Sequence, residues 1–373
     1  MQAAEQQLKQ LTRSSGVKFG GKNKWDITVH NDAFYGRVLG YGTLGVGESY
    51  MDGWWSSQDL EDTIYRLITA GADMRIRPSA KLLRDYLGAR LRNRQSTRRA
   101  YKNARAHYDI GNDLYIPMLG PSMAYSCGYW KDAKTLDEAQ VAKFELICQK
   151  LQLKRGMRVL DIGCGWGGLA MHMAQNYGVE VVGITPAREQ AKYIREHAKN
   201  MPVKVEEKDY REFTTRQKFD RVVSVGMAEH IGPKNYQSFM DKVNEVMQDE
   251  GIFLLHTIGN NKSSSTNEPW INRYIFPGAV LPSIKQLAKA SEKSFVIEDV
   301  HNFGPDYEKT LLAWYKNFKK AWPKLSDKYG ERFYRMWEFY LLSCAASFKA
   351  RHIQLWQLVL TKPQRRLPYN SVR

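Results

Sequence analysis

The stretch VLDIGCGWGG, residues 159–168, gives the strongest indication of how this chain folds. A short apolar run ends in closely spaced glycines, and an amphipathic run from Leu169 to Tyr177 follows at once. This order predicts a buried strand that turns sharply into a helix. Gly163, Gly165 and Gly167 allow positive φ and let a ligand approach the main chain. The first turn of the helix presents unpaired N–H groups at the same place.

Three kinds of turn fit this pattern. A phosphate-binding loop requires Lys followed by Ser or Thr after its glycines, and Trp166 to Leu169 stand there instead. A dinucleotide fold is the closer rival. However, Asp161 precedes the glycines, and an early acidic residue suits a cofactor with a cationic amino-acid end better than a pyrophosphate. We therefore expect S-adenosylmethionine, with a nucleotide or a purely structural turn as the alternatives.

Strand and helix patterns alternate regularly after the glycines. We predict strands over residues 179–184, 203–206, 219–225 and 252–258, with helices from Pro186 and over 235–247. Later segments predict helices over 281–290, 310–322 and 331–350 and a last strand over 353–360. Before the glycines, a helix over 135–151 begins with a capping box of Thr135 and Glu138. This order predicts a doubly wound, mostly parallel α/β sheet, whose ligands gather at the carboxyl ends of the strands.

The first hundred residues are predicted to form a smaller, mainly helical domain. We place it at residues 1–105, including a basic linker, and the catalytic domain at 106–373. Within the first domain we expect helices over 8–15 and 60–70, a strand over 25–29, and tight turns in the glycine-rich segment 40–55. Residues 80–91 combine helical apolar spacing with arginines, which is typical of a helix lying on a membrane surface or of a solvated helix face.

The positive charge of the chain is concentrated in one place. The formal net charge is +17, and residues 75–105 carry eleven Lys and Arg against a single acidic residue, Asp85. Such a segment attracts a polyanion, either nucleic acid or an anionic lipid surface. It lacks the alternation of aromatic and basic residues that suits base stacking, so we expect lipid and no nucleic acid. An RNA-directed or lipid-binding module without catalysis remains the alternative.

The composition also indicates the cellular compartment of the protein and the chemistry of its cysteines. No apolar run approaches the ~20 residues that span a bilayer, and residues 1–16 lack the hydrophobic centre of a signal peptide. The four cysteines are widely separated and form no CxxC pair, so neither a disulfide framework nor a zinc site is expected. We predict a cytoplasmic protein without a metal.

The strand ends supply the candidate cofactor residues. A sugar with two hydroxyls and an adenine ring needs hydrogen-bond acceptors together with flat apolar surface. Segments 107–115 and 123–130 are dense in polar and aromatic residues, as binding loops tend to be. Asp209 is expected to accept a bond from the adenine amino group, or else only to cap a turn. The candidates are Tyr125, Ser126, Asp161, Gly163, Cys164, Gly165, Gly167, Thr185, Gln190, Asp209 and Tyr210.

Other strand ends supply candidates for the chemistry. The strand over 219–225 leads to Glu229 and His230, without the proline-rich polar tetrapeptide that nucleobase amino methylation commonly uses. The strand over 252–258 carries His256. Either histidine alone suits a core position, but two histidines and a glutamate on neighbouring strands favour a site. Cys127 lacks an evident activating partner, so lining a polar pocket is favoured over nucleophilic attack.

With these motifs in place, the chain resembles the bacterial cyclopropane-fatty-acyl-phospholipid synthase family from about Arg37 to about Val359. The domain that precedes the glycine turn favours the phospholipid enzymes over their shorter mycolic-acid relatives. Ala228 departs from the resemblance, because the family often has an aromatic residue there, and this bears on pocket width. The resemblance rests on segments 45–55, 107–113, 125–127, 160–168 and 226–230 and on Asn235-Tyr236.

The resemblance implies a class I, Rossmann-like S-adenosylmethionine-dependent methyltransferase. A methyl group passes from the sulfonium to a cis double bond, and the resulting carbocation loses a proton from the new methyl and closes a three-membered ring. A bicarbonate ion is implied as the base. Its implied ligands are Cys127, Glu229, His256, Tyr315 and the backbone of Ile258. Cys344 is a further candidate, since a thiol at the matching place has been described as reactive in the family, although an apolar helix favours packing.

The resemblance also implies the partners. These are an unsaturated phospholipid in the membrane, an anionic lipid surface and a second copy of the chain in a homodimer. The protein is expected in the cytoplasm, peripherally associated with the inner face of the cell membrane. The alternative enzyme is a fatty-chain methyltransferase that gives a methyl branch or a methoxy group instead of a ring.

Overall fold

The computed structural model describes residues 2–72 and 110–373, and the chain divides into two compact units. Unit 1 combines residues 1–92, 266–277 and 307–353. Unit 2 combines residues 93–265, 278–306 and 354–373. Unit 1 therefore takes in two later segments beyond the domain predicted at residues 1–105. The boundary predicted between residues 105 and 106 and the basic helix predicted over 80–91 lie outside the described residues.

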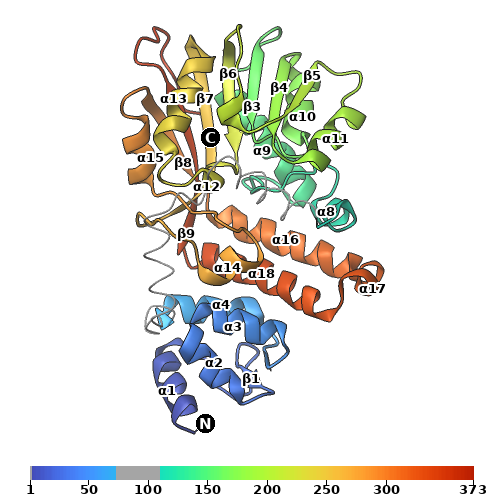
Figure 1. The fold of residues 1–373 in the computed structure, drawn as a ribbon, viewed down its shortest axis with the longest axis vertical. Helices are drawn as coiled ribbons and strands as arrows, with labels where there is room; N and C mark the ends of the chain where they lie inside the picture. The colour runs from blue at the N-terminus through green and yellow to red at the C-terminus, as the bar shows by residue number, and fades with distance from the viewer. Residues whose placement is uncertain (1, 73–109) are drawn as a thin grey trace. The chain divides into compact units, whose positions relative to one another are not determined.

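Unit 2 is built on a seven-stranded sheet with the order β5-β4-β3-β6-β7-β9-β8. Neighbours from β5 to β7 pair in parallel, and β8 pairs antiparallel with β9 (Figure 1). The predicted doubly wound, mostly parallel sheet is therefore confirmed. The strands are β3 Arg158–Ile162, β4 Glu180–Thr185, β5 Val203–Glu207, β6 Phe219–Val225, β7 Met247–Asn260, β8 Val296–Asn302 and β9 Ile353–Thr361.

Helices cover both faces of this sheet because successive strand residues point to opposite sides. Val159 of β3 packs with α9 (Leu136–Lys150) and α10 (Gly168–Tyr177). Its neighbour Leu160 packs with α13 (Tyr236–Val246) and α15 (Ile284–Ser291). α11 (Arg188–His197) packs along β5. The two apolar layers bury most of the sheet, and the capping box predicted at Thr135 is present at the start of α9.

Edge strand β8 has no counterpart among the predicted strands. Its sequence, VIEDVHN, is largely polar, and Val296 and Val300 are 44% and 42% exposed. An edge strand needs little buried surface, so its sequence carries a weak periodic signal. The other strand and helix predictions in unit 2 are confirmed in type and order. Most ends shift by one or two residues, whereas β7 begins at Met247 instead of residue 252 and α15 begins at Ile284 instead of residue 281.

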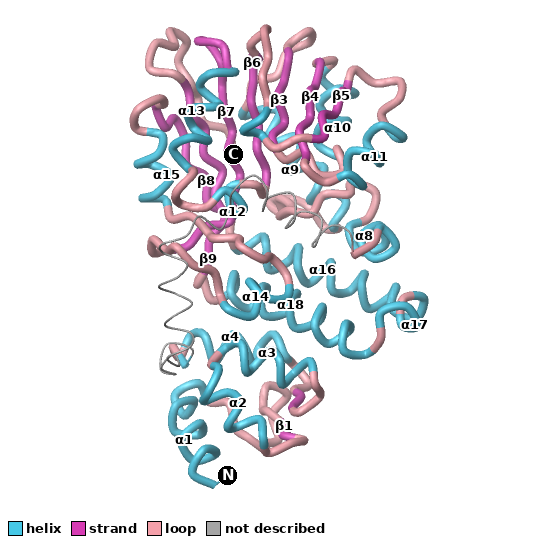
Figure 2. The backbone as a smooth tube through the Cα atoms, in the orientation of Figure 1, coloured by secondary structure: helices cyan, strands magenta, loops and turns pink. Residues whose placement is uncertain are grey.

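Unit 1 is mainly helical (Figure 2). Its later helices α16 and α18 lie antiparallel, because Tyr307 stacks on Phe348 and Phe318 stacks on Tyr334. Helix α18 packs against α3 and α4, which explains why these distant segments form one unit. The helices are α1 Gln2–Thr12, η1 Arg13–Ser15, α2 Ala33–Tyr41, α3 Thr43–Met51, α4 Leu60–Thr69, α14 Pro269–Tyr274, α16 Pro305–Ala321, η3 Trp322–Lys324, α17 Ser326–Tyr329 and α18 Glu331–Lys349, and β1 Thr28–Val29 pairs with β2 Trp55–Ser56.

The prediction of tight turns in the glycine-rich segment 40–55 was wrong, because most of this segment is helix α3. A Cβ on Gly45 would lie 2.3 Å from the carbonyl oxygen of Arg37, and a Cβ on Gly47 would lie 2.4 Å from the Trp270 ring. These glycines therefore allow close packing of helices within unit 1. Close packing outweighs the roughly 1 kcal/mol by which glycine disfavours a helix.

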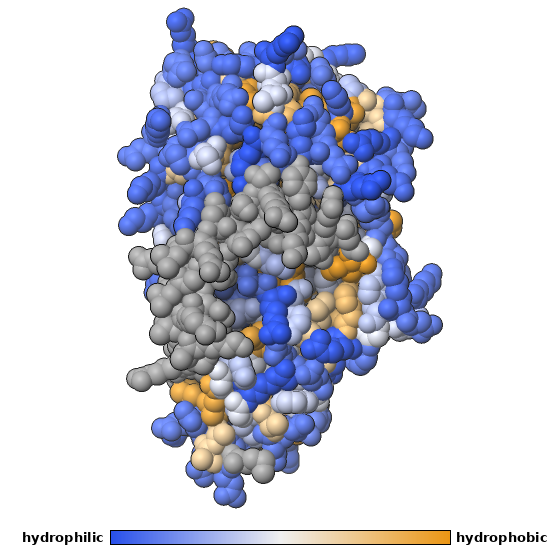
Figure 3. Space-filling view, in the orientation of Figure 1, coloured by the Kyte–Doolittle hydropathy of each residue, from blue (hydrophilic) through white to orange (hydrophobic). Residues whose placement is uncertain are grey.

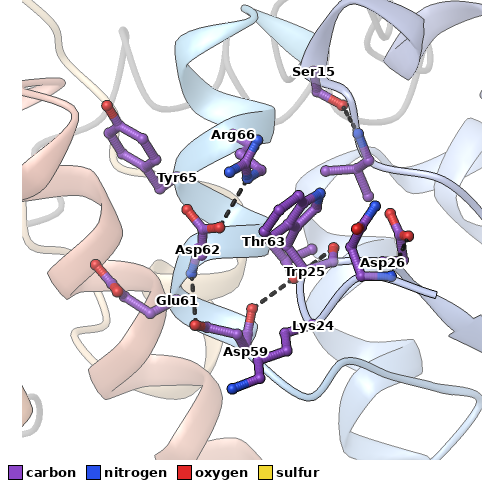
Figure 4. Close-up of polar contacts among 12 residues, drawn as sticks. Ser15, Lys24, Trp25, Asp26, Asp59, Glu61, Asp62, Thr63, Tyr65 and Arg66 are labelled. Atoms are coloured by element: carbon purple, nitrogen blue, oxygen red, sulfur yellow. Dashed lines mark hydrogen bonds and ion pairs between the residues drawn. The ribbon is translucent and has the colours of Figure 1, made fainter. Parts of the chain in front are cut away.

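The start of α4 is held by a polar cluster within unit 1 (Figure 4). Asp59 caps the helix by accepting a hydrogen bond from the Asp62 N–H at 3.0 Å. The guanidinium of Arg66 pairs with Asp62 at 2.8 Å and lies 3.8 Å from the centre of the Trp25 ring. Thr63 donates to the carbonyl of Trp25 at 3.0 Å. The cluster ties α4 to the loop before β1. Of the residues predicted as strand over 25–29, Thr28 and Val29 form β1, Ile27 makes only an isolated bridge with Phe19, and residues 25 and 26 are not strand.

Hydrophilic residues make up most of the coloured surface in Figure 3, as expected from a mean hydropathy of −0.53. Within residues 2–72 and 110–373, none of the helices has both the length and the apolar character that crossing a membrane requires.

Candidate active site

The glycine turn after β3 exposes bare backbone at the carboxyl edge of the sheet. Gly163 and Cys164 donate their N–H groups to the carbonyl of Ile184 in β4, at 2.9 and 3.1 Å. Gly167 has φ of 81°, and a Cβ there would lie 2.7 Å from Ile194 Cγ1. Gly165 has φ of 54°, and no heavy atom of the described residues lies within 4 Å of a Cβ placed on it. Gly167 therefore serves packing, whereas Gly165 leaves open space.

A second bare position lies on the neighbouring strand. Gly226 follows β6, has φ of 68°, and likewise has no described heavy atom within 4 Å of an added Cβ. Because β3 and β6 pair in parallel, the two open glycines lie at the same edge of the sheet. Open main chain at this edge, with a buried carboxyl at Asp161 of β3, fits an S-adenosyl ligand with a cationic amino-acid end.

Aromatic side chains cover the glycine turn. Trp166 donates its indole N–H to Asn112 Oδ1 at 3.2 Å, which holds α8 (Asn112–Leu119) against the turn. The ring of Tyr115 lies 5.0 Å from Trp166 and 5.4 Å from Tyr125, measured between centroids. The predicted binding loops therefore meet at the glycine turn, although the residues from 107 to 109 lie outside the described part of the chain.

A buried lysine, Lys143 of α9, organises the loop that carries Ser126 and Cys127. Its ammonium donates to Ser126 Oγ at 2.8 Å and to Gln140 Oε1 at 2.7 Å, and it is only 1% exposed. Gln140 in turn donates to the Ser126 carbonyl at 2.9 Å. The thiol of Cys127 donates to the carbonyl of Gly128 at 3.1 Å. Ser126 is therefore held through both its side chain and its backbone.

Burial shifts the pKa values of two oppositely charged groups, Asp161 and Lys143, toward neutral pH. It raises the pKa of Asp161 to about 7, against the opposing effect of the Lys143 charge. It lowers the pKa of Lys143 to about 7, partly offset by Cys127 and Asp161. Desolvation disfavours the charged form of each group, and their mutual attraction restores part of the loss. The charges of Lys143 and Asp161 therefore influence one another within the buried part of unit 2.

The remaining cofactor candidates lie at the ends of β4 and β5. Thr185 and Asp209 have protein partners, whereas the Tyr210 hydroxyl is buried without a hydrogen-bond partner within the described residues. Thr185 donates to Gln190 Oε1 at 2.8 Å. Asp209 caps the turn η2 (Tyr210–Glu212) by accepting from the Arg211 N–H at 3.0 Å, and it also pairs with the Arg211 guanidinium at 2.7 Å. The capping alternative for Asp209 is therefore present, and its contact with adenine stays a prediction.

Cys164 has a packing role in this part of the fold. Its Sγ lies 2.8 Å from the place where a Cβ on Gly183 would sit, and it belongs to the apolar cluster with Ile194. Burial raises the pKa of this thiol well above its usual value. Cys164 is therefore an uncharged packing residue of the glycine turn, and its contact with the cofactor stays a prediction.

A second group of buried polar side chains comes from the end of β6 and from the strands β7 and β9. Glu229, on the short helix α12 (Ala228–Ile231), accepts from the Ile258 N–H at 2.6 Å through Oε1. His256 Nδ1 lies 3.2 Å from Nε2 of Gln357 on β9. Within the described residues, Glu229 Oε2 and His256 Nε2 are buried without a hydrogen-bond partner. Buried polar atoms are nearly always satisfied, so this pair points to a polar ligand.

Burial also sets the charge of this second centre. It raises the pKa of Glu229 to about 7, so its carboxyl is substantially protonated near neutral pH. It lowers the pKa of His256 well below the usual value, helped by the charges of Lys143, Lys150 and His301. The centre therefore holds little negative charge of its own.

Two predicted catalytic residues lie in unit 1. Tyr315 donates to Glu338 Oε1 at 2.5 Å, and Tyr50 donates to the other oxygen of the same carboxyl at 2.5 Å. Burial and Glu338 raise the pKa of Tyr315. Cys344 lies on α18, where burial and then the charge of Glu268 raise its pKa to about 12. A protonated thiol favours the packing alternative for Cys344.

The structure thus brings Glu229, His256 and Ile258 together in unit 2, with Cys127 beside Lys143 in the same unit. Sequence inspection missed Lys143, Gln140 and Gln357. Lys143 carries one weak signal, because it falls on the apolar face of a helix where a solvated lysine is out of place. The sequence gives no signal for Gln357, because it lies among apolar residues in the last strand.

Comparisons with known proteins identify the relatives of this chain. A sequence model of the family described as mycolic acid cyclopropane synthetase matches residues 95–358. The chain is 51% identical over 353 residues to the cyclopropane-fatty-acyl-phospholipid synthase of Escherichia coli strain K12, which covers 95% of this chain and 92% of that protein. A probable fatty acid methyltransferase of Pseudomonas putida is 36% identical over 269 residues, 69% of this chain and 68% of that protein.

A solved structure gives the same result. The mycolic acid cyclopropane synthase CmaA1, crystallised in complex with SAH and CTAB, is 32% identical to this chain. The match has a TM-score of 0.66 and covers 70% of this chain and 98% of that chain.

We predict that Lys143→Met weakens the binding of S-adenosylmethionine by roughly ten-fold to a hundred-fold. The change removes charge-assisted hydrogen bonds of about 1.5 to 3 kcal/mol from the Ser126 loop and leaves Asp161 without its cation. Isothermal titration calorimetry measures the affinity, and thermal melting checks that the variant is folded.

Lys150→Met is the matched control. Lys150 is a buried lysine on the same helix, 3.4 Å from Asp299, and Asp299 keeps its two 2.6 Å contacts with Arg373 after the change. Its affinity should stay within about two-fold of the wild type, since it removes no contact of the glycine turn. Equal losses in both variants would contradict a specific role for Lys143.

Proposed function

This chain belongs to the mycolic acid cyclopropane synthetase family, and we propose that its substrate is the unsaturated acyl chain of a membrane phospholipid. It is an S-adenosylmethionine-dependent methyltransferase that forms cyclopropane rings on unsaturated lipids. The observation that carries the proposal is 51% identity, over 95% of the chain, to a cyclopropane-fatty-acyl-phospholipid synthase.

The residues of unit 2 position the methyl donor in this proposal. Bound S-adenosylmethionine supplies an electrophilic methyl group. The open backbone at Gly165 and Gly226 would border its site, and Asp161 would hold its cationic end. The remaining proposed cofactor residues are Tyr125, Ser126, Gly163, Cys164, Gly167, Thr185, Gln190, Asp209 and Tyr210.

The alkene is a weak nucleophile, so the transition state is cationic. An aromatic face such as Tyr125, which packs beside Tyr115 at the glycine turn, stabilises a cation by about 0.5 to 2 kcal/mol. Ring closure then requires a base for one proton of the new methyl group. We propose that bicarbonate supplies this base.

Glu229, His256, Ile258 and Cys127 are the proposed bicarbonate ligands in unit 2. The buried Glu229 Oε2 and His256 Nε2, which have no partner in the described residues, support this assignment. A carboxylate beside an anion would normally be repulsive. Because burial raises the pKa of Glu229 to about 7, its protonated form donates to the anion instead of repelling it. Tyr315 and Cys344 remain proposed catalytic residues, although the Tyr315 hydroxyl is engaged by Glu338.

The proposal extends to the setting of the reaction. The basic segment of residues 75–105 would dock the protein on an anionic lipid surface at the inner face of the cell membrane. A homodimer is part of the proposal through the family resemblance.

We expect the product to contain a cyclopropane ring. Pure protein is incubated with S-adenosylmethionine carrying a ¹³C-labelled methyl and with vesicles of a cis-monounsaturated phospholipid, and the lipid is examined by NMR. The label should appear in a ring methylene, whose protons resonate at higher field than any acyl methylene. Label confined to a methyl branch or a methoxy group would instead favour the alternative methyltransferase.

The bicarbonate assignment predicts that turnover falls when carbon dioxide is removed from the buffer and returns when bicarbonate is added. Glu229→Leu should raise the bicarbonate concentration needed for half-maximal rate by roughly ten-fold, because the buried hydrogen bond to the anion is lost. The KM for S-adenosylmethionine should stay unchanged. Turnover that does not respond to bicarbonate depletion would contradict the assignment.

Substituting two tyrosines of α16 tests whether Tyr315 is a ligand of the bicarbonate. Tyr315→Phe should raise the bicarbonate requirement if its hydroxyl leaves Glu338 for the anion. Tyr307→Phe is the comparison variant. Tyr307 follows Asp306 in the sequence, and the Asp306 carboxylate accepts a hydrogen bond from the Trp130 N–H at 2.7 Å. Trp130 is close in sequence to Cys127, a proposed ligand of the bicarbonate. An effect of Tyr307→Phe alone would transfer the tyrosine role to Tyr307.

The lipid assignment predicts tighter binding to anionic than to neutral vesicles, with salt weakening the difference. Changing Arg90, Arg92 and Arg94 to Gln should weaken anionic binding by roughly a hundred-fold, since each cation contributes about 1 kcal/mol. Changing the exposed Lys192, Lys199 and Lys204 to Gln alters net charge equally and should have little effect. Vesicle flotation measures both, and equal losses would show that only net charge matters.

A further inference from the structure

Gln357 contacts His256 in the interior of unit 2. Its Nε2 lies 3.2 Å from His256 Nδ1, and the two side chains are 0% and 1% exposed. They lie on the neighbouring strands β9 and β7, so rigid backbone holds both partners. A contact between two buried side chains on adjacent strands leaves neither much freedom to reorient.

The direction of this hydrogen bond determines where the imidazole carries its proton. An amide NH2 group only donates, so His256 Nδ1 accepts and has no proton. Burial and the nearby charges of Lys143, Lys150 and His301 lower the pKa of His256, which keeps the ring neutral. A neutral ring without a proton on Nδ1 carries it on Nε2.

The Nε2–H group is buried close in the fold to a second polar atom that has no partner in the described part of the chain. His256 Nε2 has no hydrogen-bond partner within the described residues, and Glu229 Oε2 is in the same condition. Their strands are adjacent, since Val225 of β6 pairs with His256, and the Gly226 N–H donates to the His256 carbonyl at 2.9 Å. Glu229 follows Gly226 by three residues, so both unsatisfied atoms belong to one strand-end cluster.

We propose that Gln357 is a positioning residue that holds His256 as the Nε2–H tautomer, so that His256 donates a hydrogen bond to the anion of the site. His256 therefore does not take the proton that leaves the new methyl group, because its only lone pair on a ring nitrogen is occupied by Gln357. The proposal rests on the proposed function for the identity of the anion. The tautomer itself does not depend on that identity.

Nitrogen-15 NMR of the full chain with labelled histidine tests the tautomer directly. The chain has eight histidines, and the resonances that disappear in a His256→Gln variant identify His256. In the wild type we expect an unprotonated Nδ1 and a protonated Nε2. In Gln357→Glu, a carboxylate replaces the donor, so Nδ1 should become protonated.

Gln354→Glu is the matched control. Gln354 lies on the same strand, is 6% exposed and accepts from Asn302 at 3.0 Å, so this change adds a buried carboxylate to β9 away from His256. His256 Nδ1 should stay unprotonated in this variant. A wild-type Nδ1 that carries a proton, or a Gln357→Glu variant in which Nδ1 stays bare, would overturn the proposal.

Kinetics test the consequence for the reaction. Gln357→Met removes the amide at similar length and should raise the bicarbonate concentration for half-maximal rate roughly ten-fold, with the KM for S-adenosylmethionine unchanged. An unchanged bicarbonate requirement in this variant would refute the donor role. If the wild type shows no bicarbonate dependence, the assignment of the anion fails, while the NMR result still decides the role of Gln357.

Discussion

Burial of ionisable side chains at the carboxyl edge of the sheet is the constraint on which the site depends. Lys143, Asp161, Glu229 and His256 are between 1% and 5% exposed. A charge removed from water costs several kcal/mol unless it is paired, and the usual response is a shift in pKa toward the neutral form. The shifts of Asp161, Lys143 and Glu229 to about 7 follow this rule. The same water-poor edge would shield the carbocation of the proposed mechanism from attack by water.

The parallel sheet makes such a cluster possible. Strands that run in the same direction end at one edge, so residues from β3, β6 and β7 meet there although they are far apart in sequence. Helix α9 closes one side with Lys143, and β9 returns late in the chain to place Gln357 beside His256. Each buried polar group is thus held by a separate rigid element, which limits rearrangement when a ligand binds.

Unit 1 shows a different use of packing. Its helices α3 and α4 pack on α18, which comes from the last part of the chain, so the described residues 2–72 alone lack part of their core. Gly45 and Gly47 let α3 lie close to Arg37 of α2 and to Trp270 of α14 by omitting a side chain. The carboxyl group of Glu338 accepts hydrogen bonds from the hydroxyls of Tyr50 and Tyr315, and these bonds join α3, α16 and α18. The composition of the unit is therefore settled by packing across distant segments.

Local sequence patterns were enough to predict the glycine turn, the alternation of strands and helices, and the family. Periodicity, capping residues such as Thr135 and closely spaced glycines act over a few residues, so they can be read along the chain. Glu229 and His256 were found for the same reason, since each sits on or just beyond a recognisable strand. The helical conformation of residues 43–51, the burial of Lys143 and the contact of Gln357 with His256 became clear only in the folded protein. Helix α3 receives a hydrogen bond at Glu48 from Tyr274, 226 residues later, and Gln357 is 101 residues from His256. No local pattern encodes such a contact, because it exists only when the folded sheet and helices bring the two side chains together.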